Sequence, residues 1–131
     1  MFRRDLLLAE IQKLSLALSR LIGLKEEDKG LQLEQEMDEL LEKDFGILYT
    51  DLLQSGDADF TEFLKEKDFT SEKLDMLSQL LFLRIDPDVK DKPGQKELAG
   101  KLLLIYSYLE QNHQIINMLN IGRQQTLKTY L

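Results

Sequence analysis

Apolar residues recur at spacings of three and four along most of the chain, which is the period of one face of an α-helix. The first such segment covers about residues 3–22, and Gly23 follows it directly. Glycine is the residue that most often ends a helix in a left-handed conformation. We therefore predict a long first helix that ends before Gly23 and buries Leu7, Ile11, Leu14, Leu18 and Leu21.

Further apolar residues lie beside this stripe and widen it, namely Leu6, Leu8, Leu16 and Ala17. One pair of neighbouring helices covers only part of such an arc, and monomers rarely leave a large apolar patch in water. The first helix is therefore expected either at the centre of the core or against a second chain. We name Leu8 and Leu16 as candidate contacts of a homodimer.

Three shorter segments with the same period follow a charged connector at residues 25–30. The first ends at Phe45-Gly46, and a short helix comes after it. Asp57 or Asp59 is expected to cap a third helix of one to two turns. The apolar positions of the three segments are Leu33, Met37, Leu40 and Leu41, then Ile47, Leu48, Leu52 and Leu53, then Phe60, Phe63 and Leu64.

The second half of the chain contains the clearest loop, at residues 86–95. A helix that Thr70 or Ser71 caps should end at Asp86-Pro87, because proline disfavours helical geometry in the preceding residue. The apolar positions before and after the loop are Leu74, Leu77, Leu81 and Ile85, then Leu98, Leu102, Ile105 and Leu109, then Ile115, Ile116, Leu119, Leu127 and Tyr130. We predict six or seven helices in one all-α domain, residues 1–131.

Composition and charge restrict where this domain works and what it binds. Apolar residues make up 43% of the 131 residues, and there is no cysteine. The apolar run near the N-terminus is too short for a signal peptide, and no stretch is long enough to span a membrane. We therefore expect a cytoplasmic protein. Residues 23–70 hold five basic and fifteen acidic residues, whereas no segment offers the basic face that nucleic acid needs. The acidic middle is either a solvated surface or a docking face for a basic partner.

Three patterns approach known ligand-binding motifs and fail. Asp86, Asp88, Asp91 and Glu97 echo a calcium loop, but Lys90 occupies a ligand position. The segment from Gly94 to Gly100-Lys101 has five residues between its glycines instead of four, and Leu102 replaces the required Ser or Thr. Glu110 and His113 have the spacing of a di-iron pair, but His113 is the only histidine. We expect no metal, no cofactor and no enzymatic activity.

Three large side chains in the C-terminal part remain as candidates for a binding surface: Tyr106, Tyr108 and Met118. Aromatic residues anchor many interfaces, but at helical spacing they also build cores. Both alternatives stay open here. Tyr108 is the better candidate for exposure because it falls off the stripe of Leu102, Ile105 and Leu109.

The order of these elements resembles a family of small, uncharacterised bacterial proteins with tetratricopeptide-like helical hairpins. The similarity is carried by Arg4-Asp5, by Leu21-Ile22-Gly23-Leu24-Lys25, by Leu40-Leu41, by Leu77, Leu80, Leu81 and Phe82, and by Ala99-Gly100-Lys101-Leu102 with Ile105-Tyr106. The resemblance implies stacked antiparallel hairpins and a protein-binding role, with small residues such as Gly23 and Ala99-Gly100 where helices touch. A compact helical bundle is the alternative architecture.

The function that these observations favour is a non-catalytic protein-binding or adaptor module. It would act through a groove between helices or as a homodimer, with an unidentified protein as its partner, a basic one if it docks on the acidic middle. The alternative is a regulatory domain that binds a small apolar ligand within the helical array.

Overall fold

The computed structural model describes residues 2–86, 88–89, 91–113 and 118–131, without the side chains of residues 2–4 and 118–119. Within these residues the chain is helical and has no strand. The helices are α1 (Phe2–Glu26), α2 (Gly30–Leu40), α3 (Tyr49–Gln54), α4 (Asp57–Lys67), α5 (Ser71–Phe82), α6 (Gln95–Asn112) and α7 (Met118–Lys128), and a π-helical turn, Leu41–Phe45, extends α2. The all-α prediction is confirmed.

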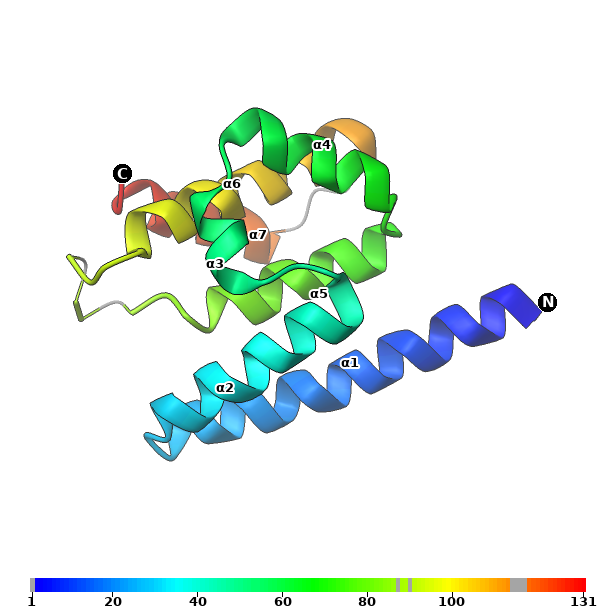
Figure 1. Cartoon of the computed structure of the whole chain (residues 1–131), viewed down its shortest axis with the longest axis horizontal. Coiled ribbons are helices and arrows are strands. Elements are labelled where there is room, and N and C mark those ends of the chain that lie inside the picture. The colour runs from blue at the N-terminus through cyan, green and yellow to red at the C-terminus, as the bar shows by residue number, and fades with distance from the viewer. Residues whose placement is uncertain (1, 87, 90, 114–117) are drawn as a thin grey trace.

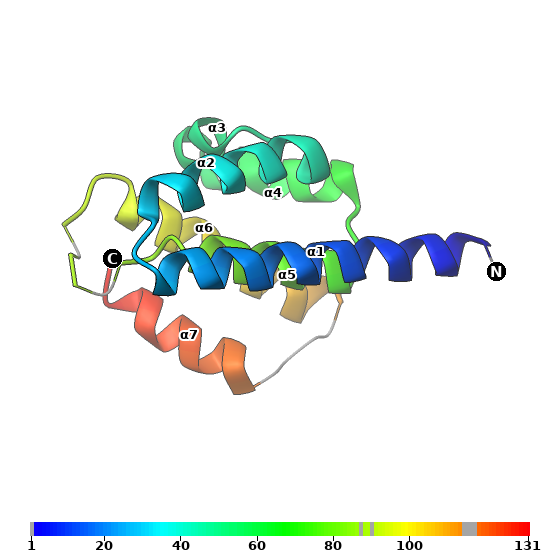
Figure 2. The same cartoon turned by 90° about the horizontal axis from the view of Figure 1, so that it is seen from below.

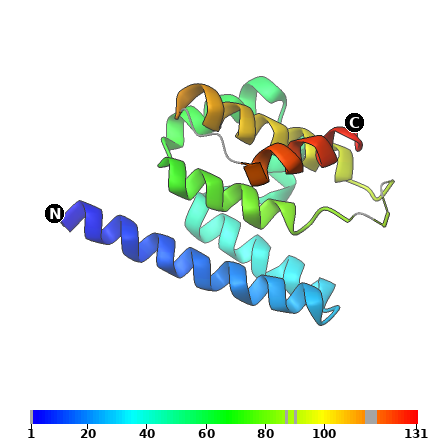
Figure 3. The ribbon, with the colours of Figure 1, turned by 180° about the vertical axis from the view of Figure 1, so that it is seen from behind.

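The helices form three tiers, of which α1, α5 and α6 make the middle one (Figure 2). On one side of this tier α2 packs on α1, and α3 and α4 pack on α6. On the other side α7 packs on α6. α1 and α2 form an antiparallel hairpin, and α1 runs parallel to α5 at the edge of the tier (Figure 1). The first turns of α1 project beyond both neighbours (Figure 3).

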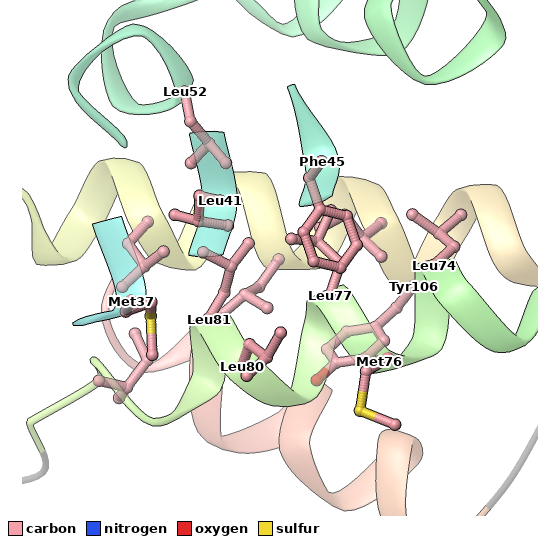
Figure 4. Close-up of a cluster of buried hydrophobic side chains, with 14 of the residues drawn as sticks. Met37, Leu41, Phe45, Leu52, Leu74, Met76, Leu77, Leu80, Leu81 and Tyr106 are labelled. Carbon is pink, nitrogen blue, oxygen red and sulfur yellow. The ribbon is translucent and has the colours of Figure 1, made fainter. Parts of the chain in front are cut away.

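The core lies around α5 and α6 because these helices have neighbours on most sides. Met37, Leu41 and Phe45 reach down from α2 and the π turn onto Leu77 and Leu81 of α5 (Figure 4). All five side chains are at most 1% exposed. Burying one such side chain contributes roughly 1.5–3 kcal/mol, so this contact is a main source of stability.

Local signals in the sequence locate several helix ends correctly. Thr70 caps α5, because its hydroxyl oxygen accepts a hydrogen bond of 3.2 Å from the amide of Lys73. Gly46 ends the π turn with φ of 71°, a conformation that glycine adopts without strain. The predicted stripe of Leu98, Leu102, Ile105 and Leu109 on α6 is buried throughout.

The first helix does not end before Gly23, as the sequence predicted, but continues to Glu26. Leu24 is buried, and the ammonium of Lys25 donates hydrogen bonds of 2.9 and 3.4 Å to the carbonyls of Leu83 and Ile85. These contacts offset the cost of about 1 kcal/mol that glycine imposes within a helix. A Cβ atom added at Gly23 or Gly100 would meet nothing within 4 Å, so neither glycine serves a close helix contact.

The expected bounds were also wrong at α4, α5 and α6. α4 extends over three turns, and its N-cap is Gly56, with neither Asp57 nor Asp59 in that position. α5 ends at Phe82, before Asp86-Pro87. Gln95 belongs to α6 and is buried. Its side-chain amide donates to the carbonyl of Arg84 at 2.9 Å and its oxygen accepts from the amide of Asp86 at 2.8 Å, which joins the two ends of the loop.

Candidate interaction surface

One side of α1 faces away from every other helix, and we call it the outward face. Its members repeat at helical spacing and are all exposed: Leu8, Gln12, Ser15, Leu16, Ser19 and Ile22. The leucines are 55% and 75% exposed and Ile22 is 39% exposed. The opposite side of α1 packs on α2 and α5 through the buried Leu14, Leu21 and Leu24. The outward face is exposed because α1 lies at the edge of its tier.

The six residues of the outward face are uncharged, and the exposed Asp5 and Glu26 lie at its two ends. Every charged side chain from Glu10 to Lys25 contacts a neighbouring helix or its end. Glu10 pairs with Lys73 at the start of α5, and Lys13 pairs with Asp44 of the π turn at 3.2 Å. Lys25 holds the carbonyls beyond α5, as described above. The fourth charged residue, Arg20, pairs with Glu36 of α2.

The Arg20–Glu36 ion pair is bidentate and lies at the boundary between the outward face and α2. The guanidinium donates through Nε at 2.5 Å and through Nη2 at 2.9 Å to the two carboxylate oxygens. These bonds, with a further one of 2.9 Å from Gln32, lower the pKa of Glu36 to about 2. Both partners are solvent-accessible, so the pair orients side chains more than it stabilises the fold.

The predicted dimer contacts, Leu8 and Leu16, therefore lie where a partner can reach them. Ile22 joins the same face six residues after Leu16, and the sequence pattern did not single it out. Its signal was its spacing of three and six residues from Ser19 and Leu16, which becomes informative only once the buried side of α1 is known. α1 is not the centre of the core, which was the other possibility for its broad apolar arc.

The predicted binding residues of the C-terminal part do not form one surface. Tyr106 is 1% exposed, so its ring belongs to the core, and of the two alternatives for this residue the groove is wrong. Burial raises the pKa of its hydroxyl, and the nearby Arg123 opposes that rise. Tyr108 is half-buried, with its ring centroid 5.9 Å from that of His113. The side chain of Met118 lies outside the described residues.

Neither a cluster of metal-ligating side chains nor a membrane-spanning helix occurs among the described residues. Within residues 2–86, 88–89, 91–113 and 118–131, no three His, Asp or Glu side chains gather closely enough to hold a metal ion. No helix of that part is long and apolar enough to cross a membrane.

Comparison with known proteins gives no relative: no family model, no curated protein and no solved structure matches the chain. The resemblance to tetratricopeptide-like proteins thus stays a prediction, and the outward face has to be interpreted from its own geometry.

Proposed function

We propose that this protein is a non-catalytic interaction module that forms a homodimer through the outward face of α1. The observation that carries the proposal is the contrast between the two sides of α1. Three large apolar side chains lie exposed over four turns without a charge among them, while the charged side chains from Glu10 to Lys25 all hold neighbouring helices. Solvated helix faces normally carry charges.

A two-fold axis near Ser15 would place two α1 helices antiparallel. Ser15 then faces its own copy, and Leu8 of one chain faces Ile22 of the other. The short side chains of Ser15 and Ser19 let the helices approach closely. This direction also brings the basic start of α1, Arg3-Arg4, toward the acidic end at Glu26-Glu27 of the other copy. A parallel pair would bring like charges together instead.

The size of this contact indicates a weak dimer. α1 has 25 residues and is about 37 Å long. Stable interfaces bury roughly 1,200–2,000 Å² in total, and one pair of helices of this length lies near the lower limit. Dilution should therefore dissociate the dimer.

The same arrangement supports a tetratricopeptide-like interpretation of the fold. The antiparallel hairpins α1–α2 and α5–α6 place their first helices side by side and parallel, as successive units of a helical repeat array do. The short helices α3 and α4 then form an insertion between the two hairpins.

The test is the molar mass in solution, measured by light scattering from low micromolar to several hundred micromolar protein. The wild type should rise from 15.3 kDa toward twice that value. Leu16→Glu should remain monomeric with an unchanged circular dichroism spectrum, because Leu16 makes no core contact. Leu31→Glu is the matched control, since Leu31 is 85% exposed on α2, off the outward face. A wild type that stays at 15.3 kDa, or a control that dissociates equally, would refute the homodimer.

A further inference from the structure

A second surface lies between the π turn, α3 and α4, and we call it the acidic groove. It consists of two hollows of about 450 and 290 Å³ that meet at Glu42 and Leu48. The larger one is lined by Ile47, Phe60 and Phe63, together with Asp51 and Asp59. The smaller one extends along the end of α2 past Glu39.

The floor of the groove is apolar and firmly held. Leu48 is 47% exposed where the two hollows meet, whereas Phe60, which also lines the larger hollow, is fully buried. The rings of Phe60 and Phe63 stack with centroids 6.0 Å apart, and Phe69 meets Phe63 edge-on at 6.1 Å. A floor fixed in this way loses little conformational entropy when another side chain packs on it.

The rim of the groove carries four exposed carboxylates, those of Glu39, Glu42, Asp51 and Asp59. In the part of the chain that the structure describes, none of the four forms an ion pair. Their neighbours do: Asp38 pairs with Arg84 at 2.6 Å, and Asp44 pairs with Lys13. The rim carboxylates are thus left available for a cation from outside, although the ammonium of Lys67 also lies at the groove, 5.9 Å from the centroid of the Phe63 ring.

Helix stability explains only half of these carboxylates. Asp51 and Asp59 lie in the first turns of α3 and α4, where negative charge favours the helix dipole. Glu39 and Glu42 lie at the end of α2 and in the π turn that extends it. Negative charge is unfavourable at the C-terminal end of a helix, and the two carboxylates, which are three residues apart, also repel each other. The helix dipole therefore does not account for these two carboxylates, and a role in binding would.

We infer that the acidic groove binds a basic amphipathic helix of a partner protein. One large apolar side chain of that helix would pack on Leu48 and enter the larger hollow, against Ile47 and Phe63. Lysine or arginine side chains one turn away on either side would meet the rim carboxylates. Recognition of this kind combines an apolar anchor with flanking charges, as helix-in-groove complexes do. The groove is separate from the outward face of α1, so this inference does not depend on the homodimer.

A fluorescently labelled amphipathic peptide of leucine and lysine serves as the probe, with fluorescence anisotropy as the readout. Binding should weaken about tenfold or more in the double variant Glu42→Lys/Asp59→Lys, because two attractive contacts become repulsive. The control Glu72→Lys/Glu97→Lys changes the net charge equally at exposed positions elsewhere, and its affinity should stay close to that of the wild type. A peptide of the same composition without helical periodicity should bind more weakly.

Amide shifts in a ¹⁵N–¹H NMR titration locate the bound peptide, and they should cluster at residues 46–63. Absence of binding, equal weakening in the control, or shifts that cluster elsewhere would each overturn the inference. Failure of the Glu42→Lys/Asp59→Lys variant to dimerise as the wild type does would also overturn the inference, because the groove would then bind a second copy of this chain. Peptide binding by Leu16→Glu separates failure of the groove from failure of the homodimer.

Discussion

α1 and α6 are both long and rich in leucine, but the structure uses them in opposite ways. α6 has α5, α7, α3 and α4 around it and buries eight of its 18 residues. Among the described residues, α1 packs mainly on α2 and α5, with a further ion pair to the π turn, and leaves Leu6, Leu8 and Leu16 more than half exposed. The number of neighbours, more than the hydrophobicity of the helix, decides which leucine stabilises the fold. An apolar side chain without neighbours is then available to a partner.

The largest expected effect separates a leucine of α6 from a leucine of α1. Leu102→Ala should lower the free energy of unfolding by about 2–5 kcal/mol, because the fully buried side chain leaves a cavity. Leu16→Ala should change it by less than about 0.5 kcal/mol at concentrations where the protein is monomeric. Urea denaturation followed by circular dichroism measures both. Similar losses for the two variants would show that α1 is buried in solution.

The second effect concerns how α6 begins. Gln95→Ala removes both hydrogen bonds that join the ends of the loop and leaves the carbonyl of Arg84 and the amide of Asp86 without that partner. A loss of about 1–3 kcal/mol is expected in the same denaturation experiment. Gln95→Glu should also destabilise, since a carboxylate cannot donate to the Arg84 carbonyl. If Gln95→Glu were as stable as the wild type, these two hydrogen bonds, which we call the Gln95 clamp, would not form in solution.

A smaller effect of opposite sign tests the two glycines within α1 and α6. Gly23→Ala and Gly100→Ala should each raise the free energy of unfolding by about 0.5–1 kcal/mol, because both positions are helical and a Cβ meets no neighbour. Gly46→Ala is the contrasting variant. It should destabilise, since φ is 71° and the new Cβ would lie 2.7 Å from the ammonium of Lys67. A loss of stability in Gly23→Ala would place the end of α1 at Gly23 after all.

The smallest effect is the pH dependence of the pair that joins α1 to α2. Because Arg20 lowers the pKa of Glu36 from 4.5 to about 2, the contribution of the pair is complete above about pH 4.5 and is lost as the pH falls toward 2. A ¹³C NMR titration of the Glu36 carboxyl should find the low midpoint. In Arg20→Gln the midpoint should move up toward 4.5. An ordinary midpoint in the wild type would mean that the two side chains separate in solution.

Periodicity predicted the elements and their buried stripes because it records which side of each helix faces the protein. It could not rank the helices by centrality, since α1 and α6 show the same spacing. The prediction that the first helix ends before Gly23 was wrong because Leu24 and Lys25 extend α1 through tertiary contacts, which the sequence pattern does not show. Gln95 was assigned to the loop because its hydrogen bonds to Arg84 and Asp86 join positions that only the fold brings together.

For the candidate surfaces, the sequence predicted less. Leu8 and Leu16 were named because they lie off the buried stripe, which a helical projection shows directly. The only sequence signal for the acidic groove was the excess of acidic residues over residues 23–70. Its apolar floor comes from Ile47, Leu48 and Phe63, which periodicity assigns to buried stripes. Only the packing of α3 and α4 leaves Leu48 at the surface.

Because of the Gln95 clamp, the stability of the domain should depend little on the length of the loop. Because the amide side chain ties Arg84 and Asp86 to the start of α6, the positions of these ends do not depend on the residues between them. Lengthening a loop whose ends are already fixed costs little, about 0.6 kcal/mol for each doubling. A foreign sequence inserted between the exposed Asp88 and Val89 should therefore leave the rest of the chain in place. This makes the loop a natural position for an internal affinity tag or a fluorescent reporter.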